Sequence, residues 1–489
     1  MSNPGRPAIK DITEARDKIG KLTPEIIRNA TVEGFVDNSN GFGALAKNGH
    51  RPSAETATQT IPTVVEAYYD IGRKEYLIQN AAGRWHSYDQ GQFKLQLRAR
   101  GYSTGKPPDG LVSPAEVVML EIQNRSDVQY AGSLAGRKAG FYEENGMRIL
   151  ITSSPEILAA DERDWSLLEK VLRNVIANES EPWAQHQWTV FNGWLKIARL
   201  ALASGNFQPA QALALAGEVD SGKSLLQSII TEALGGRAAK AAMFLQGRTD
   251  FNSELFGAEH LILEDESAST SHMARSALGA AIKTIAVNQI HQCHGKRRDI
   301  VNLAPRWRLS ISLNNEPERM MILPRLSNDV SDKIILLRAT RKPMPEPAET
   351  PDEKDAFWQR LMAELPGYLH WLETQFEIPK EWVSSRFGVK EFHHPELVAA
   401  LDELSPAFVL LELIDQLKPW GKAGNEWEGT AIELRQLLIA DDRTRRDSSR
   451  LLDWTNACGQ YLGELASLRP HRVQNARKEL RRNWKILAP

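Results

Sequence analysis

An apolar run that ends in a glycine-framed turn with a lysine constrains this chain more than any other feature. The stretch reads LALAGEVDSGKSLLQSIITEAL over residues 213–234, and residues 217–224 fit the pattern G-x-x-x-x-G-K-[ST]. In such a loop the glycines let the main chain approach phosphates, the lysine neutralises phosphate oxygens and the hydroxyl binds Mg²⁺. The flanking runs are typical of a strand and a helix, as the motif requires. The sequence therefore predicts a P-loop for ATP, or another nucleoside triphosphate, and Mg²⁺, formed by Gly217, Ser221, Gly222, Lys223, Ser224 and Leu225.

Two carboxylates inside this loop are unusual, because the loop must receive phosphates. Glu218 and Asp220 occupy positions that are usually filled by small residues or by glycine and proline. Either they point to solvent, or the loop binds ATP loosely until a neighbouring subunit arrives.

A second apolar run ends in three consecutive acids. HLILEDESAS, residues 260–269, places Glu264, Asp265 and Glu266 at the end of an expected strand. Acids at the carboxyl end of a central strand face the nucleotide, where one holds Mg²⁺ through water and another activates the attacking water. The string admits two alignments, so the division of these roles stays open. Glu264 and Asp265 are the favoured pair, with Glu266 in reserve, and a solvated strand end is the alternative.

A third buried strand ends in a polar tip. In RWRLSISLNNEPERMMILPRL, residues 306–326, Asn314 is placed to position the attacking water or to contact the γ-phosphate, unless it only caps a turn. Arg325 follows eleven residues later. It is a candidate arginine finger for the ATP of a neighbouring subunit, or else an exposed surface arginine. Arg338 and Lys333 are rivals for that role or for a second sensor.

Between the second and third strands lies a basic hairpin. IHQCHGKRRDIVNLAPRW, residues 290–307, has two short β-like runs around a tip that holds His294, Lys296, Arg297 and Arg298. Cations on a glycine-containing turn can meet nucleic-acid phosphates in a salt-sensitive, sequence-independent way. A solvated basic turn is the alternative.

Length and composition limit the class of protein. A chain of 489 residues exceeds one ordinary core, and apolar strands that alternate with amphipathic helices over 208–340 predict an α/β core with a largely parallel sheet. The net charge of −2 excludes an overall basic nucleic-acid binder, so any such surface must be local. Two cysteines exclude a disulfide framework and a Cys-rich zinc site. With a polar N-terminus and no apolar run of about 18 residues, a cytoplasmic protein without membrane spans is expected.

Taken together, these parts resemble a superfamily 3 helicase, an AAA+-related group of small DNA viruses, phages and plasmids. The shared order is P-loop, acidic strand end, basic β-hairpin, strand ending in Asn, and arginine finger. GRTDFNSELFGAEHLILEDESAS and ELPGYLHWLETQF further resemble the helicase portion of phage and mobile-element primase-helicases. The resemblance implies an ATP-dependent DNA helicase or translocase in replication, a ring expected to be a hexamer, single-stranded DNA in its pore, and a separate primase or replication partner.

The resemblance also suggests a division into five segments. These are an N-terminal α+β accessory region (1–130), a strand patch with a helical collar (131–207), the ATPase core (208–345), a helical connector (346–395) and a winged-helix-like domain (396–489). Within the first segment, residues 1 to about 60 are expected to be helix and polar loop, and the segment is too short for a primase-polymerase. The pattern of the last segment predicts three helices and a final short strand, with WGKAGNEWEGT as a glycine-rich loop between helices. This segment is basic near its end, where residues 469–489 hold Arg469, Arg472, Arg477, Lys478, Arg481, Arg482 and Lys485.

Two other functions use the same features. One is an origin-binding or DNA-binding scaffold in which ATP only licenses assembly. The other is an ATPase that remodels proteins or serves anti-phage defence, without unwinding. Slow turnover that is indifferent to DNA would mark the first, and the sequence does not separate the second from a helicase.

Overall fold

The computed structural model describes residues 66–106, 112–144, 146–178, 180, 182–265, 268–296, 298–326, 329–403, 405–421, 424–478 and 481–489. The helix and loop expected before residue 60 lie outside these residues. The described residues all belong to one compact unit. In the described part of the chain no helix is long and apolar enough to cross a membrane.

The first described elements build a small mixed sheet with two helices. The strand order is β3-β2-β1-β4, with β1 antiparallel to β2 and parallel to β4. Phe93 and Leu97 of one helix and Met119 of the other are buried against Tyr76 of β2. The elements are β1 (Ala67–Asp70), β2 (Glu75–Gln79), β3 (Trp85–Tyr88), α3 (Gln90–Ala99), α4 (Pro114–Arg125) and β4 (Asp127–Val128).

A second small sheet and two long helices lead into the centre of the molecule. β5 (Tyr130–Gly132), β6 (Gly140–Glu144) and β7 (Met147–Ile151) form a sheet of order β5-β7-β6. Two helices follow, α5 (Ser166–Ile176) and α6 (Ala184–Ser204). α6 is buried along most of its length, including Trp188 and Trp194.

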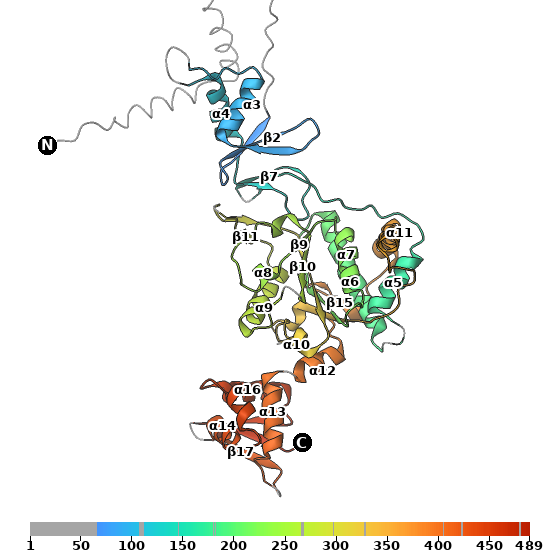
Figure 1. Cartoon of the computed structure of the whole chain (residues 1–489), viewed down its shortest axis with the longest axis vertical. Coiled ribbons are helices and arrows are strands. Elements are labelled where there is room, and N and C mark those ends of the chain that lie inside the picture. The colour runs from blue at the N-terminus through green and yellow to red at the C-terminus, as the bar shows by residue number, and fades with distance from the viewer. Residues whose placement is uncertain are drawn as a thin grey trace, which may run out of the picture. The chain divides into compact units, whose positions relative to one another are not determined.

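A five-stranded parallel sheet forms the core, as the alternation of apolar strands and helices predicts. Its order is β14-β8-β13-β10-β9, and every neighbouring pair is parallel. The P-loop strand β8 lies between two strands that come much later in the chain, so a crossover occurs beside it. Figure 1 shows β9 and β10 of this sheet with helices on either side. In α/β sheets such a switch point marks where ligands bind, at the carboxyl ends of the strands.

The elements of this core are β8 (Ala212–Gly217), α7 (Lys223–Ala233), β9 (Ala238–Lys240), α8 (Ala242–Leu245), β10 (His260–Glu264), α9 (His272–Val287), β11 (His291–Cys293), β12 (Val301–Leu303), β13 (Arg308–Asn314), α10 (Pro317–Met320) and β14 (Ile334–Ala339).

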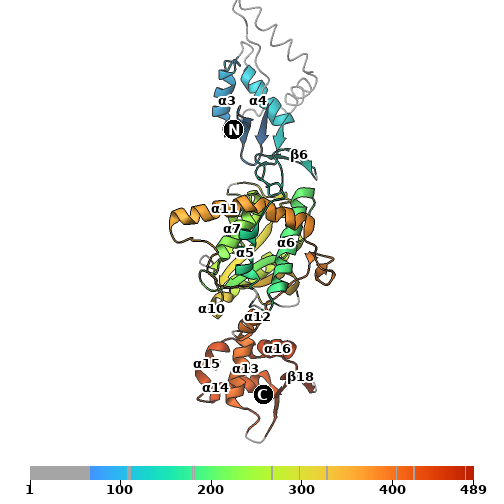
Figure 2. The same cartoon turned by 90° about the vertical axis from the view of Figure 1, so that its right-hand side faces the viewer.

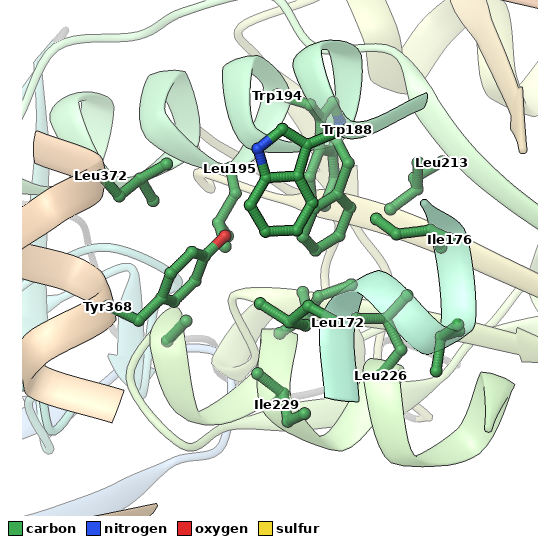
Figure 3. Close-up of a cluster of buried hydrophobic side chains, with 14 of the residues drawn as sticks. Leu172, Ile176, Trp188, Trp194, Leu195, Leu213, Leu226, Ile229, Tyr368 and Leu372 are labelled. Carbon is green, nitrogen blue, oxygen red and sulfur yellow. The ribbon is translucent and has the colours of Figure 1, made fainter. Parts of the chain in front are cut away.

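Helices cover both faces of the sheet because its strands are apolar on both sides. Leu213 and Leu215 of β8 face a cluster built by α5, α6, α7 and α11 (Pro351–His370), which Figures 2 and 3 show. Ala214 and Ala216, which alternate with them, face the cluster that contains α8 and α9. Full burial of these strands fixes the sheet between two helical layers.

The remaining elements lie C-terminal to the core. β15 (Val383–Ser384) and β16 (Gly388–Val389) pair, and α12 (Pro395–Glu403) follows. The last domain holds α13 (Pro406–Leu417), β17 (Glu426–Thr430), α14 (Ala431–Ala440), α15 (Arg445–Leu451), α16 (Ala457–Leu468), β18 (Val473–Lys478) and β19 (Arg481–Leu487). Its strands form an antiparallel sheet of order β17-β19-β18 around buried Trp484.

The structure confirms the α/β class and the parallel sheet and corrects the last segment. The sequence analysis predicts helices and one final short strand there, whereas two strands close the chain and a third, β17, occupies residues expected to be a glycine-rich loop. β17 has the sequence EWEGT, whose charged residues and glycine hide its strand character. The five proposed segment boundaries stay predictions.

Candidate functional site

The P-loop connects the end of β8 to the start of α7. Gly217 ends the strand so close to β14 that a Cβ there would lie 2.3 Å from the carbonyl oxygen of Ala339. Gly222 precedes the helix with a φ of +82°, which favours glycine. Both glycines of the motif are therefore required by the geometry of the loop.

The start of α7 is suited to an anion. Gly222 precedes Lys223 at the N-cap and provides no side-chain cap. The first main-chain N–H groups of an 11-residue helix are thus left for another acceptor. Ser224 is exposed in this first turn, while Ser221 is buried and Leu225 packs against the core. These residues fit a triphosphate with its Mg²⁺.

Lys223 links the loop to the neighbouring strand tip. Its Nζ donates to the carbonyl oxygens of Gly217 (2.9 Å) and Glu218 (2.6 Å), and it lies 3.3 Å from the Oγ of Ser221. It also donates to the Oδ1 of Asn314, at 3.2 Å. The ammonium group therefore lies where the P-loop meets the end of β13.

Asn314 and Asp265 join at the same edge. β8 and β13 pair in register so that Asn314 stands opposite Gly217, and the N–H of Asn315 donates to the Gly217 carbonyl at 3.2 Å. The main-chain N–H of Asn314 donates to the Oδ2 of Asp265 at 3.2 Å. The structure thus brings together Lys223, Asp265 and Asn314, three residues that the sequence analysis singled out.

The acidic string divides between two directions. Glu264, the last residue of β10, accepts a hydrogen bond from the Nζ of Lys240 on β9 at 2.7 Å. Asp265, one residue later, turns toward Lys223 and Asn314. Glu266 lies outside the described residues. Of the favoured pair, Glu264 and Asp265, it is Asp265 that lies near Lys223 and Asn314.

Burial and charge oppose each other at Lys223. Burial lowers the pKa of Lys223 below its usual value, and four carboxylates counter that shift, in the order Asp265, Glu316, Asp220 and Glu218. Glu316 was not among the predicted site residues. Its place two residues after Asn314 is the only sequence signal that points to it.

A buried ring of hydrogen bonds connects the helix that follows the P-loop to two strands of the sheet. The side-chain amide of Gln227 donates to Ser310 Oγ (2.8 Å), which lies 2.8 Å from His260 Nε2. His260 Nδ1 lies 2.7 Å from Thr231 Oγ1, which donates to the Gln227 carbonyl (3.0 Å). Since the Thr231 proton is used on that carbonyl, His260 must donate through Nδ1 and accept through Nε2. The ring joins α7 to β10 and β13.

The candidate cations pair with residues outside the P-loop. Arg325 pairs with Glu464 of α16. Arg338 pairs with Glu396 of α12, although its main chain lies on β14 opposite Ala216, next to Gly217. Lys333 is largely buried and donates to Asp332 at 2.6 Å.

The basic hairpin forms as the sequence predicts. β11 and β12 pair antiparallel, with His291 opposite Leu303 and Cys293 opposite Val301. His294 is partly buried, and Lys296 and Arg298 are exposed, whereas Arg297 lies outside the described residues.

A neighbouring loop that the sequence analysis missed holds this hairpin. Asn252 clamps it, because its Oδ1 accepts from the His294 N–H (2.7 Å) and its Nδ2 donates to the Gln292 carbonyl (2.9 Å). The exposed ring of Phe251 lies 4.9 Å from that of His294, and Lys296 Nζ lies 5.9 Å above the Phe251 ring. The only sequence signal is an aromatic residue in a polar stretch, RTDFNSE.

Comparisons with known proteins give remote likenesses. No protein-family model matches the chain, and no curated protein sequence matches it significantly. The apo structure of the NrS-1 C-terminal region has a TM-score of 0.48 at 14% identity and covers 87% of this chain and 96% of that one. The helicase SCCmec type IV Cch gives 0.29 at 11%, with 84% and 76% covered. The JCV helicase gives 0.24 at 13%, with 51% and 72% covered. The function is therefore argued from the site itself.

Proposed function

We propose that this protein is an ATP-dependent DNA helicase or translocase that works as a ring, expected to be hexameric, in the replication of a phage, plasmid or other mobile element. The observation that carries the proposal is the meeting of Lys223, Asp265 and Asn314 at the carboxyl edge of a parallel sheet. A P-loop lysine, a carboxylate and an amide at one strand edge are the parts that phosphoryl transfer to water needs.

The P-loop binds ATP. Lys223 exchanges its carbonyl partners for phosphate oxygens, and the first N–H groups of α7 receive the same phosphates. The Ser224 hydroxyl and Asp265, with Glu264 in support, would hold Mg²⁺, which would supply positive charge to the phosphate oxygens. Asn314 detects the γ-phosphate by donating a hydrogen bond from its side-chain Nδ2, while its Oδ1 accepts from Lys223.

Hydrolysis is completed by a second subunit. Arg325 enters the neighbouring ATP site and stabilises the charge that develops on the transferred phosphoryl group. Among the described residues its side chain pairs with Glu464 and not with its own P-loop, which agrees with a role on another copy. A residue that acts in trans makes a closed ring the natural assembly, because each subunit then both gives and receives an arginine.

Single-stranded DNA binds at the hairpin. His294, Lys296, Arg297 and Arg298 contact the phosphates, and Phe251 beside them offers a face on which a base or sugar can pack. The Asn252 clamp ties the hairpin to the loop before β10, the strand that ends beside Asp265. The hairpin can thereby follow changes at the nucleotide site.

The last domain is proposed to be a winged-helix-like DNA contact. Helices α13, α14 and α16 pack around a three-stranded sheet whose terminal hairpin carries the sequence RKELRR over residues 477–482. A basic hairpin beside a helical core suits contact with DNA phosphates.

ATPase rates with and without single-stranded DNA test this proposal. We expect turnover that DNA stimulates and that Lys223→Ala abolishes. Slow turnover indifferent to DNA would favour a scaffold licensed by ATP. Robust turnover indifferent to DNA would favour a protein-remodelling or defence ATPase.

A further inference from the structure

The tip of the P-loop carries two carboxylates, Glu218 and Asp220. Glu218, Val219 and Asp220 are all exposed, Val219 to 56%. Neither acid forms an ion pair with another residue in the described part of the chain. Asp220 has a φ of +62°, a conformation that is unfavourable for residues other than glycine. A strained, charged and exposed tip is typical of a segment that something else must contact.

These carboxylates work against the ligand of their own loop. Lys223 Nζ donates to the main-chain carbonyl of Glu218 at 2.6 Å, so the phosphate-binding ammonium lies next to the loop tip. The charges of both acids counter the lowering of the Lys223 pKa by burial. The same charge repels a triphosphate. In a lone chain, therefore, Glu218 and Asp220 weaken the binding of ATP.

A cleft elsewhere on the core has the opposite charge. It lies between α9 and residues 324–325 and 329–330, with a volume of about 290 Å³. Three cations, Arg275, Lys283 and Arg325, line it together with one carboxylate, Asp329. Lys283 pairs with Asp329, and Arg325 pairs outside the cleft with Glu464.

Arg275 has no carboxylate partner among the described residues. Its Nε donates to the Leu323 carbonyl at 2.9 Å, and its Nη1 lies 3.3 Å from the sulfur of Met321. Burial and the charge of Arg325 lower the pKa of Arg275, and the charge of Glu464 counters this shift. Arg275 therefore holds the segment just before Arg325 through the Leu323 carbonyl and not through an ion pair of its own with a described carboxylate.

The cleft and the tip must face each other wherever Arg325 acts in trans. Arg325 lies on the cleft, and on the proposed function it reaches a triphosphate that rests on the P-loop of a second copy. The outermost part of that loop is Glu218–Asp220. We infer that the P-loop acids of one copy dock into the Arg275–Lys283 cleft of the next. This inference rests on the proposed ring, and it makes ATP affinity depend on assembly.

A double-mutant cycle between subunits tests the docking. The variants are Asp220→Asn, Arg275→Gln and their combination, and the readout is the protein concentration at half-assembly with ATP present, from sedimentation or mass photometry. We expect each single change to raise that concentration about five-fold, as the loss of one modest ion pair would, and the double variant to lose little more than either single one. Arg319→Gln, at an exposed arginine on α10 outside the cleft, is the matched control. Its effect on the concentration at half-assembly should simply multiply with the effect of Asp220→Asn.

A second arm measures ATP affinity below the assembly concentration. Glu218→Gln with Asp220→Asn should bind ATP about five-fold more tightly than the unchanged chain, because the repulsion is gone. The inference is overturned if the effects of Asp220→Asn and Arg275→Gln multiply, or if the neutral loop binds ATP no better. If the natural chain neither assembles nor hydrolyses ATP, the proposed ring is wrong as well. If it assembles and hydrolyses ATP but Asp220→Asn and Arg275→Gln act independently, only the docking inference is wrong.

Discussion

At the scale of single residues, the site turns on how side chains alternate at a strand end. Lys223 is readable from the sequence, because the P-loop pattern fixes its position relative to both glycines. The roles of the acids cannot be read from the sequence. Glu264, Asp265 and Glu266 are consecutive, and side chains of consecutive residues in a strand point in opposite directions. Only the pairing of Glu264 with Lys240, and of Asp265 with the Asn314 main chain, separates them.

The separation of the two acids leads to a first prediction. Asp265→Asn should lower the rate of ATP hydrolysis at least 100-fold, because it removes the carboxylate beside Lys223, whereas Glu264→Gln should lower it by about ten-fold or less. Steady-state ATPase assays at saturating ATP distinguish the two. Equal losses would mean that both acids reach the reacting phosphate.

Asn314 gives a second prediction. Asn314→Ala should lower kcat by about 10- to 100-fold while ATP binding stays within a few-fold, because the amide senses the γ-phosphate and Lys223 retains its other contacts. Nucleotide titration beside turnover measures both quantities. A loss of binding without a loss of kcat would contradict the sensor role.

His260 makes the stability of the core depend on pH. Burial lowers its pKa from 6.5 to about 3, so the folded chain keeps it neutral while the unfolded chain takes up a proton below pH 6.5. The stabilisation of the folded state by neutral His260 is complete above pH 6.5 and is lost as the pH falls toward 3. Between pH 7 and pH 5 we expect a loss of about 2 kcal/mol in the free energy of unfolding. The free energy of unfolding, measured with urea at both pH values, should show this loss in the natural chain and not in His260→Gln. An equal dependence on pH in the two chains would contradict the prediction.

At the scale of elements, local patterns were readable and long-range contacts were not. The hairpin of β11 and β12 follows from two apolar runs around a glycine-containing tip. The loop that supports it does not, because Asn252 and His294 are far apart in sequence and only the fold joins them. β17 was missed for a related reason, since EWEGT becomes a strand through its pairing with β19.

This pair of elements carries a prediction about DNA. Lys296→Ala should weaken binding of single-stranded DNA and reduce its salt dependence by about one ion, because one phosphate contact is lost. Phe251→Ala should weaken binding by about 1–3 kcal/mol with an unchanged salt dependence, because a stacking face is lost. Fluorescence anisotropy at several salt concentrations separates these effects. Lys354→Ala, at an exposed position near the start of α11, is the control. An equal loss of binding in that variant would contradict a role of the hairpin in DNA binding.

At the scale of the whole molecule, the sequence predicted the parallel sheet but not its order. Alternating strands and helices imply parallel strands, whereas the position of β13 beside β8 depends on long-range packing that local patterns do not encode. This strand order places Asn314 opposite Gly217. The ring is a proposal at this scale, because Arg325 can complete a site only on another copy.

Mixing of variants tests action in trans. Arg325→Ala subunits keep an intact P-loop, and Lys223→Ala subunits keep an intact arginine, so neither should hydrolyse ATP alone. An equal mixture should regain a measurable fraction of the activity, because some interfaces combine both intact halves. Arg325→Ala chains that hydrolyse ATP normally by themselves would contradict the finger assignment.

The account as a whole is tested most directly by strand displacement on a forked DNA duplex. With ATP and Mg²⁺, the protein should release the shorter strand at a rate that follows ATP hydrolysis, and Lys223→Ala should release none. ATP hydrolysis without displacement, and without stimulation by single-stranded DNA, would contradict the helicase proposal.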